Sequence, residues 1–384
     1  MRITPRATLP ADPRPALVAA LSGRALAGAA RRAGDRVVVL DLFADGDTRH
    51  MAESCIAIRA GRMGFDRDEL VAAVTRLAPQ VRGLVYGAGF EHDPPLLATL
   101  ATLLPVLGNS AETVARVKDP LRFAALLARL GLPHPPTTRA PPPRGEGGWL
   151  RKIVGGSGGR HIAIGRQSEG VAESYFQRRV PGRPVAAAFV ADGCNAEVLG
   201  YSEQWPDAAE HAPFRYGGCA GPVTPSSRLC GRITEACNAV VAAAGVVGLN
   251  SLDLLVDGDN FHVLEINPRP GATLDLFDGR AGQSLWRLHL DAVAGRLSAR
   301  RSVMKGGVRA AAILYAPRDI AIPGAMAWPA WAADRGVAGT RIRSGEPICT
   351  LRASAPTVTA ARAALDRRAT RLLARFGGAG VRSP

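Results

Sequence analysis

The strongest chemical signal in the sequence is a pair of carboxylates that a β-hairpin can bring together. Residues 251–266 alternate polar and apolar side chains around a central Asp-Gly turn signal, which predicts two paired strands. If the strands pair across a three-residue loop centred on Asp259, then Asp253 lies opposite Glu265. The two-residue period of a strand then places Asn267 on the same face.

Two carboxylates and an amide oxygen on one face form a candidate metal site. Such hard oxygen ligands suit Mg²⁺, with Mn²⁺ as the alternative metal, and a cation would relieve the repulsion between the carboxylates. The opposite face is apolar and is predicted to be buried; it carries Leu252, Leu254, Val256, Leu264 and Ile266. A solvated acidic face is the competing interpretation, but it does not explain why Arg269 and a Pro-Gly pair follow directly.

A second signal comes from the scarce lysines. Of 48 basic residues only Lys118, Lys152 and Lys305 are lysines, which suggests positions where a compact ammonium is needed. Lys152 precedes a glycine-rich run made of Gly155, Gly156, Ser157, Gly158 and Gly159. Backbone N–H groups of such a run can close around phosphate oxygens, with the lysine adding a point charge. A plain hairpin turn is the alternative, because no helix follows the run as it does in P-loop and Rossmann patterns.

The elements that must position these residues follow from hydrophobic patterning. Alternating strand and helix signals predict a parallel α/β sheet in the first 110 residues. The strand signals lie at 16–21, 36–41, 83–86 and 105–108, and the helix signals at 22–34 and 94–104. Residues 112–130 have helical spacing that is broken at Asp119-Pro120. Beyond a Pro-rich linker, strand signals lie at 149–154, 161–164, 174–180, 185–191 and 196–201, and a helix signal at 229–244. From residue 306 the pattern is β-rich, and it ends in a helix at 356–376.

Composition narrows the class of protein. The chain has 384 residues, of which 47% are hydrophobic, enough for two or three domains. Its net charge of +15 is diffuse and its aromatic content is 5%, so nucleic-acid binding is not expected. No uncharged stretch approaches the roughly 18 residues of a membrane span, and a cytoplasmic location is the expectation. The six cysteines lie far apart, without the spacing of a zinc site.

Taken in their order along the chain, these residues resemble the ATP-grasp superfamily. The matching features are Lys118, Lys152 with its glycine run, the hinge segment 177–182, and Asp253 followed by Glu265-Ile-Asn-Pro-Arg269. The resemblance implies an α/β protein with the ATP-grasp fold in three parts. These are a Rossmann-like parallel α/β domain at 1–110, a nucleotide-binding domain at 111–300 with a lid at about 149–185, and a β-rich segment with a helix at 301–384.

The resemblance also implies roles for individual residues. Lys118 and Lys152 would hold ATP phosphates under the glycine lid, and backbone groups of Gln177 and Val180 would meet the adenine edge. Asp253, Glu265 and Asn267 would ligate Mg²⁺. Arg269 would be catalytic together with Lys152, because it would stabilise an acyl-phosphate and the tetrahedral intermediate that follows. In contrast to the family, the hinge carries Arg178 and Arg179 where a Glu is usual, and Arg183 stands near the expected ribose contact.

The function that the resemblance implies is an ADP-forming ligase that joins a small-molecule carboxylate to an amine. The group of similar enzymes nearest in pattern is the tyramine-glutamate ligases, which build a methanofuran-type cofactor of one-carbon metabolism. A purine-type enzyme that forms carboxyphosphate and a nucleotide-binding protein without catalysis are the alternatives. A dinucleotide dehydrogenase is disfavoured because Ser22-Gly23 is not part of a G-x-G-x-x-G run. A homodimer is an open option.

Overall fold

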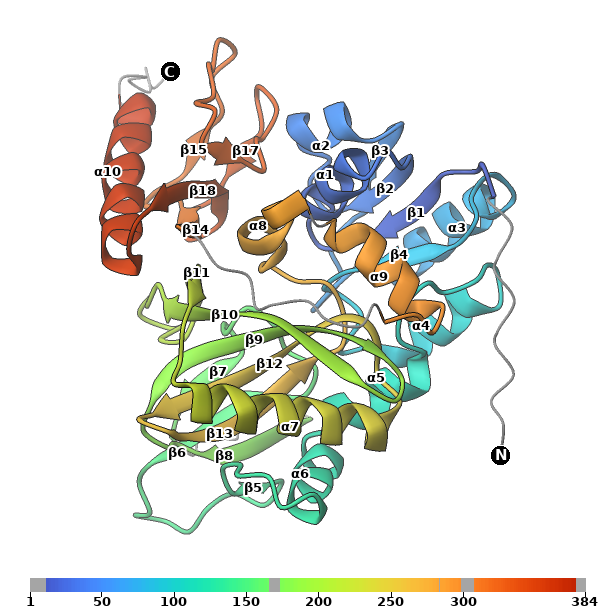
Figure 1. The fold of residues 1–384 in the computed structure, drawn as a ribbon. Coiled ribbons are helices and arrows are strands. Elements are labelled where there is room, and N and C mark those ends of the chain that lie inside the picture. Colours follow the sequence, from blue (N-terminus) through green and yellow to red (C-terminus); the bar gives the residue numbers. More distant parts are fainter. Residues whose placement is uncertain (1–11, 166–172, 283, 298–306, 378–384) are drawn as a thin grey trace.

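The computed structural model describes residues 12–165, 173–282, 284–297 and 307–377. Lys305 and residues 166–172 of the predicted lid lie outside the described residues. Within the described part the strands form four sheets (Figure 1). No helix of that part is long and apolar enough to cross a membrane.

The N-terminal sheet is parallel, as predicted. It has the order β3-β2-β1-β4, and its strands are β1 (Ala16–Ala19), β2 (Val37–Asp41), β3 (Ser54–Ala57) and β4 (Leu84–Tyr86). Its helices are α1 (Arg24–Arg32), α2 (Gly46–Met51), α3 (Arg67–Leu77) and α4 (Pro94–Ala101). The strand predicted at 105–108 is reduced to an isolated bridge between Leu84 and Val106. Because all strands run in one direction, the loops that follow them meet at one edge of the sheet.

Two helices and a small antiparallel sheet follow. The predicted break at Asp119-Pro120 separates α5 (Ala111–Lys118) from α6 (Pro120–Arg129), and the Asp119 carboxylate caps α6 by accepting from two backbone N–H groups. The small sheet has the order β5-β8-β6-β7, with β5 (Thr137–Thr138), β6 (Trp149–Ile153), β7 (Ile162–Ile164) and β8 (Ser174–Arg178). The glycine run therefore joins two neighbouring strands, β6 and β7.

The largest sheet is antiparallel and has the order β13-β12-β9-β10-β11-β14-β18-β16. Its strands are β9 (Arg183–Asp192), β10 (Ala196–Pro206), β11 (Tyr216–Val223), β12 (Val247–Asp257), β13 (Asn260–Asn267), β14 (Val308–Tyr315), β16 (Ala332–Ala333) and β18 (Pro347–Ala355). The C-terminal segment adds the short pair β15 (Ile320–Ala321) and β17 (Arg341–Ile342), and α10 (Val358–Gly377). Strands from both sides of the predicted boundary at residue 300 share this sheet, and the division into three domains stays a prediction.

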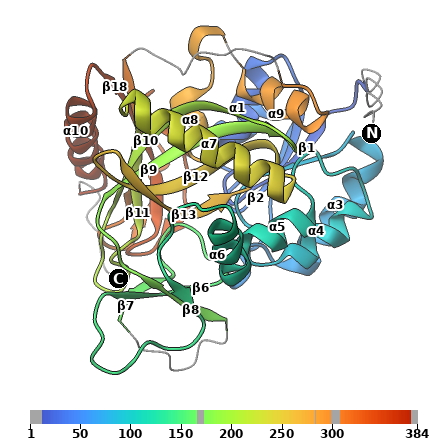
Figure 2. The same cartoon turned by 60° about the horizontal axis from the view of Figure 1, so that its bottom comes forward.

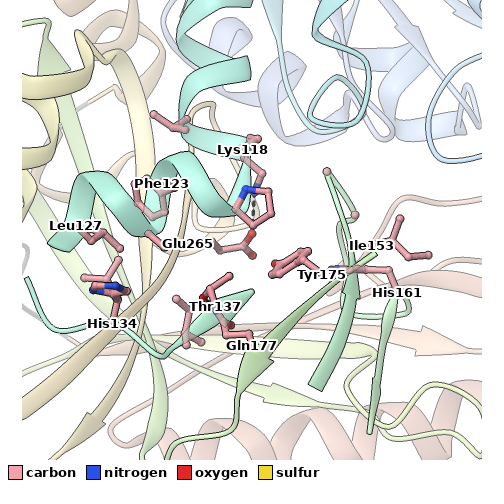
Figure 3. Close-up of a pocket in the computed structure, with 17 residues that line it drawn as sticks. Lys118, Phe123, Leu127, His134, Thr137, Ile153, His161, Tyr175, Gln177 and Glu265 are labelled. Carbon is pink, nitrogen blue, oxygen red and sulfur yellow. Dashed lines mark hydrogen bonds and ion pairs between the residues drawn. The ribbon is translucent and has the colours of Figure 1, made fainter. Parts of the chain in front are cut away.

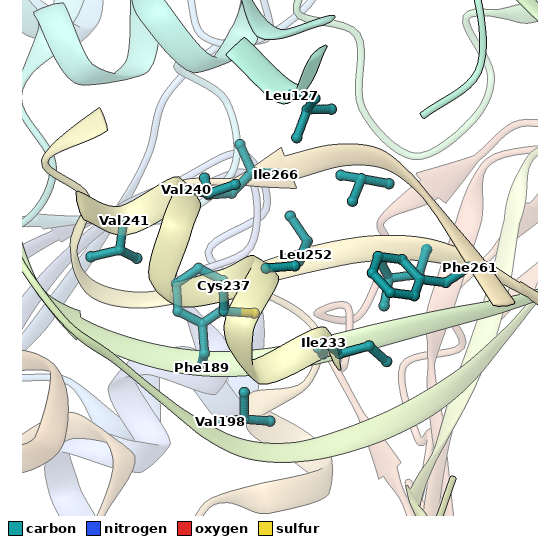
Figure 4. Packing of buried hydrophobic residues seen from close by; sticks show 14 of the residues in the cluster. Leu127, Phe189, Val198, Ile233, Cys237, Val240, Val241, Leu252, Phe261 and Ile266 are labelled. Atoms are coloured by element: carbon teal, nitrogen blue, oxygen red, sulfur yellow. The ribbon is translucent and has the colours of Figure 1, made fainter. Parts of the chain in front are cut away.

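Helix α7 (Ser227–Ala244) covers one face of the large sheet, and both Figure 1 and Figure 2 show it crossing β9, β10 and β12. Its apolar positions recur at helical spacing and are buried; they are Leu229, Ile233, Ala236, Cys237, Val240, Val241 and Ala244. They pack against Phe189, Leu252 and Ile266 of the sheet (Figure 4). Because one face of the β12–β13 hairpin is taken up by this core, its polar face must point to the other side.

The N-terminal and large sheets share a hydrophobic core. Two short helices that were not predicted, α8 (Leu274–Phe277) and α9 (Leu285–Val293), fill the space between them. Phe277 and Trp286 of these helices belong to the same buried cluster as Ala29 and Ala30 of α1. The cluster therefore joins the N-terminal sheet to the large sheet that contains the hairpin.

Candidate functional site

The β12–β13 hairpin places its polar residues on one face. Asp253 pairs with Glu265, and Ser251 pairs with Asn267, in the predicted register. The route to that register differs from the prediction. The loop is a two-residue turn at Gly258-Asp259 rather than three residues centred on Asp259, and a β-bulge between Asp253 and Leu254 restores the pairing.

The bulge also changes the predicted buried face. Leu254 pairs with Val263, so Leu264 is the extra residue of the bulge. Leu264 is therefore only partly buried and lines a pocket beside Glu265, whereas the sequence predicted that it faces the core. The other predicted core residues of the hairpin, among them Leu252 and Ile266, are fully buried.

Lys118 and Glu265 form the centre of the site. Lys118 is the last residue of α5, and its Nζ donates to Glu265 Oε2 at 2.7 Å and to the Ile266 carbonyl at 3.3 Å (Figure 3). The Lys118 side chain is 6% exposed, whereas that of Glu265 is 38% exposed, on the side that lines the pocket. The pair is thus covered on the lysine side and accessible on the carboxylate side.

The two carboxylates of the hairpin are in different electrostatic states. Burial raises the pKa of Glu265, but the charges of Lys118 and Lys152 outweigh it, and the net pKa lies below the ordinary value. Burial and the neighbouring Glu265 charge raise the pKa of Asp253 to about 6. Asp253 is therefore the carboxylate that most needs a cation.

The donor set fits Mg²⁺ or Mn²⁺. Within the described residues no cluster of three or more His, Cys, Asp or Glu could hold a metal, so the candidate is the predicted set of two carboxylates and an amide. Asn267 Nδ2 donates to Asp253 Oδ2 at 3.0 Å, which keeps the amide and the carboxylate together. The remaining Asn267 Oδ1 faces Arg269 Nη2 at 3.4 Å.

Lys152 reaches into the same region from β6. It is buried, and its Nζ donates to Gln177 Oε1 of β8 at 2.7 Å. Burial lowers the pKa of Lys152, and the Glu265 charge opposes this effect. The sequence assigned a backbone role to Gln177, but the structure shows that its side chain also lines the pocket and holds Lys152. Val180 follows β8 and is not among the described residues that line the pocket.

The glycine run is docked against two other segments, the loop after β4 and residues 214–216. Gly155, at φ +69°, leaves no space for a side chain because a Cβ would lie 2.4 Å from the His92 Cα. The Gly158 carbonyl accepts from the Tyr216 N–H at 2.9 Å. At Gly159 a Cβ would lie 1.8 Å from the Phe214 carbonyl oxygen. These glycines allow backbone-to-backbone contact, and Gly155 and Gly156 also line the pocket.

Arg269 is bound to a residue that was not predicted. Its Nε donates to Glu91 Oε1 at 2.7 Å; the Glu91 side chain is buried and that of Arg269 is 11% exposed. Burial lowers the pKa of Arg269, but the Glu91 carboxylate more than offsets this, so the pKa is raised. Glu91 follows β4 at the edge of the parallel sheet where ligand sites occur, and that position was the available sequence signal.

A pocket of about 470 Å³, including space open to solvent, lies next to these groups (Figure 3). Much of its wall is apolar and comes from Val117, Phe123, Leu127, Ile153, Val263 and Leu264. Thr137, Tyr175 and His161 also line it, and none was predicted as a site residue. The pocket thus combines an apolar wall with Lys118 and Glu265 at its polar side.

Family and sequence comparisons agree with the predicted motif order. Residues 117–273 match the ATP-grasp domain model. The carbamoyl phosphate synthase large chain of Rubrobacter xylanophilus is 29% identical over 212 residues, 48% of this chain and 19% of that protein. The C-terminal section of the same large chain from Methanopyrus kandleri is 26% identical over 217 residues, 50% of this chain and 40% of that one. The chain thus spans less than half the length of these relatives.

Solved structures share the arrangement of sheets. The biotin carboxylase domain of 2-oxoglutarate carboxylase from Hydrogenobacter thermophilus, determined with MgADP, ADP and bicarbonate, superposes with a TM-score of 0.71. The match covers 93% of this chain and 90% of that one at 13% identity. Biotin carboxylase from Campylobacter jejuni gives a TM-score of 0.64, covering 91% and 89% at 14% identity. At identities this low the likeness establishes a common fold.

Proposed function

This chain contains an ATP-grasp domain and has the ATP-grasp fold, and we propose that it uses ATP to activate a small carboxylate as an acyl-phosphate for transfer to an amine. The observation that carries the proposal is the convergence of Lys118, Glu265, Asp253 and Arg269 beside the apolar pocket. Cations for phosphate groups and oxygen ligands for a metal then lie beside a pocket with an apolar wall, where the base of a nucleotide would bind.

The nucleotide would bind with its base between the apolar side chains of α6 and β13. Gln177 and Thr137 offer polar groups at the edge of that pocket. Lys118 and Lys152 would then meet the phosphates, under backbone N–H groups of the glycine run. Asp253, Glu265 and Asn267 would hold Mg²⁺, which supplies charge neutralisation to the phosphates when bound.

The reaction would proceed in two displacements. An oxygen of the carboxylate attacks the γ-phosphorus, the bond to the bridging oxygen breaks, and ADP leaves. The amine lone pair then attacks the acyl carbon, the carbon–oxygen bond to phosphate breaks, and the amine proton passes to solvent. Arg269 would face the negative charge that develops at both stages, because its Nη2 is directed towards the ligand Asn267.

The finer part of the proposal concerns the substrates. The resemblance to tyramine-glutamate ligases supports glutamate as the acid and an aromatic amine as the acceptor. The named relatives support a second candidate, in which bicarbonate is the carboxylate and carboxyphosphate is the intermediate. The two candidates differ in a single requirement, because only the second needs bicarbonate for ADP formation.

The proposed function predicts that Glu265→Gln abolishes ADP formation in a folded protein. ADP release is measured over a panel of acids and amines with and without bicarbonate, and product mass identifies the bond formed. Asp257→Asn is the matched control, since Asp257 lies exposed at the far end of the same hairpin. Near-normal turnover of Glu265→Gln would overturn the site, and background ADP release by the wild type with every substrate would favour a nucleotide-binding protein without catalysis.

A further inference from the structure

We infer that Glu91, in the loop after β4, is a positioning residue that sets the orientation of Arg269. The inference rests on the proposed function, because it assigns Arg269 a part in the reaction. It also makes the N-terminal sheet a contributor to the reaction centre, since Glu91 belongs to that sheet's edge and Arg269 to the end of the nucleotide-binding hairpin.

The Glu91 carboxylate is itself fixed by its own loop. Its Oε2 accepts from the backbone N–H groups of Gly89 at 2.8 Å and Phe90 at 3.1 Å. Its Oε1 is left for Arg269 Nε, at 2.7 Å. The two carboxylate oxygens thus bind different partners. Glu91 is also buried, with only 4% of its surface exposed. Because backbone groups hold one oxygen, the other presents a defined direction to the guanidinium.

This contact leaves the outer edge of the guanidinium available. A guanidinium is planar with donors in a fixed fork, so holding the Nε–H sets where the two Nη atoms point. Here Nη2 lies 3.4 Å from Asn267 Oδ1, on the side of the candidate metal ligands. Nη1 donates to the Pro270 carbonyl at 3.5 Å. Glu91 therefore holds the inner part of the guanidinium, and Nη2 is the nitrogen directed to the site.

The same loop touches the glycine run, so both parts of the site depend on its position. The Glu91 carbonyl oxygen would lie 2.6 Å from a Cβ at Gly155, which only glycine avoids. Behind the loop, the Tyr86 hydroxyl at the end of β4 donates to the Asn109 carbonyl at 2.9 Å and is 3.3 Å from the Pro268 carbonyl. The strand is thereby tied to the residue that precedes Arg269.

Glu91 is ionised, as an ion pair with Arg269 requires. Burial raises the pKa of Glu91, but Arg269, Lys118 and the backbone N–H of Gly89 together lower it by more. The net pKa is therefore below the ordinary value. Unpaired, a carboxylate this buried would be costly, and its only ion pair within the described residues is the one with Arg269.

The test compares Glu91→Gln with the wild type and with Glu91→Asp. We expect Glu91→Gln to lower kcat for ADP formation about 10- to 100-fold, the range found when partners that orient site groups are removed. The KM for ATP should change little, because Glu91 does not face the nucleotide pocket. In an Arg269→Gln background the same substitution should have almost no further effect, since Glu91 acts through Arg269.

Asp35→Asn is the matched control, because Asp35 also forms a largely buried ion pair in the N-terminal sheet, with Arg82. It should lower the melting temperature and leave kcat unchanged. Additive losses in the Arg269→Gln background, or a kcat for folded Glu91→Gln equal to that of the wild type, would overturn the inference. Should Glu91→Gln fail to fold, Glu91→Asp provides the same comparison with the charge retained.

A readout without turnover separates this inference from the proposed function. Phenylglyoxal reacts with arginine, and peptide mass shows how fast Arg269 is modified. We expect modification of Arg269 to be severalfold faster in Glu91→Gln and unchanged in Asp35→Asn. If the wild type forms no ADP, the proposed function is rejected. The rates of Arg269 modification in the wild type and Glu91→Gln still test whether Glu91 orients Arg269. Equal labelling rates in wild type and Glu91→Gln would reject the positioning role.

Discussion

Single residues in the site control one another's charge. The lysine Nζ of Lys118 keeps Glu265 ionised, whereas Asp253 has no lysine in hydrogen-bond contact within the described residues and its pKa is raised. A cation bound between the two carboxylates would therefore compete with a proton at Asp253.

Metal binding should weaken in acid for this reason. The pKa of Asp253 lies at about 6, so lowering the pH through that value protonates free Asp253, and Mn²⁺ or Mg²⁺ must then displace the proton. The apparent Kd should rise by up to about tenfold per pH unit below the pKa, since one proton is released. Calorimetric titration of Mn²⁺ at several pH values measures this. Asp253→Asn should bind more weakly and without the pH dependence, and a flat wild-type profile would contradict the assignment.

Lys118 should contribute to nucleotide affinity in two ways. Lys118→Met removes the proposed phosphate partner and also the counter-charge of Glu265, whose pKa then rises. The expected loss of MgADP affinity is about 1.5–3 kcal/mol, the range for a charge-assisted hydrogen bond. Arg116→Met, on the same helix, is the control, because its i,i+4 pair with Glu112 is exposed and is worth roughly 0.3–0.5 kcal/mol. Calorimetric titration of MgADP into both variants shows whether the loss of affinity is specific to Lys118 or follows from removing any positive charge from α5.

Among the elements, the glycine run and the bulge of the β12–β13 hairpin shape the pocket. The run closes on the loop after β4 and on residues 214–216, while the bulge turns Leu264 into the pocket beside Glu265. Both features depend on backbone conformation more than on side-chain chemistry.

Two neighbouring glycines of the run offer a matched pair of variants. Gly158 and Gly159 have φ of +66° and +72°, so alanine at either position costs about 1 kcal/mol in the left-handed region. Gly158→Ala meets nothing within 4 Å, whereas Gly159→Ala places its Cβ against the Phe214 carbonyl. Gly159→Ala should therefore raise the KM for ATP strongly while Gly158→Ala changes it little. Equal KM values in steady-state kinetics would show that docking on Phe214 is unimportant.

Across the whole molecule, one buried arginine joins three distant segments. Arg24 of α1 donates to Asp275 Oδ1 of α8 at 2.7 Å and to Asp334 Oδ1 of the C-terminal segment at 3.0 Å, and its side chain is 9% exposed. Burial raises the pKa of Asp334, but Arg24 lowers it more, so Asp334 stays ionised. The N-terminal sheet and the C-terminal segment are thereby held in one arrangement around the site.

Asp334→Asn should destabilise the protein by about 1.5–3 kcal/mol, because the buried Arg24 loses one of its two charged partners and keeps Asp275. The folded pKa of Asp334 is below its ordinary value, so the wild type has this stability above that value and loses it as the pH falls towards the folded pKa. The difference in the free energy of unfolding between the wild type and Asp334→Asn should thus become smaller in acid. Urea unfolding at several pH values measures it. Arg36→Met, which breaks an exposed pair with Glu53, should reduce the free energy of unfolding much less, and an equal reduction there would void the comparison.

Local signals were enough to predict part of this arrangement. Strand alternation predicted that Asp253 faces Glu265, the Asp119-Pro120 pair predicted the break between α5 and α6, and motif order predicted the ATP-grasp fold. Each of these depends on residues close together in the chain or on their sequence order. The roles of the site residues stay predictions.

Only the tertiary structure revealed what surrounds the hairpin. The pairing of Glu91 with Arg269 joins residues 178 positions apart, and no local pattern encodes it. Likewise, the two-residue turn sets one register near Asp257, whereas Asp253 pairs with Glu265 in a register one residue away. The bulge at Leu264 reconciles the two registers. The sequence by itself determined the chemical groups and the shared face of Asp253, Glu265 and Asn267. The folded chain decided the place of Leu264 and which distant groups meet, because such contacts depend on the packing of all elements together.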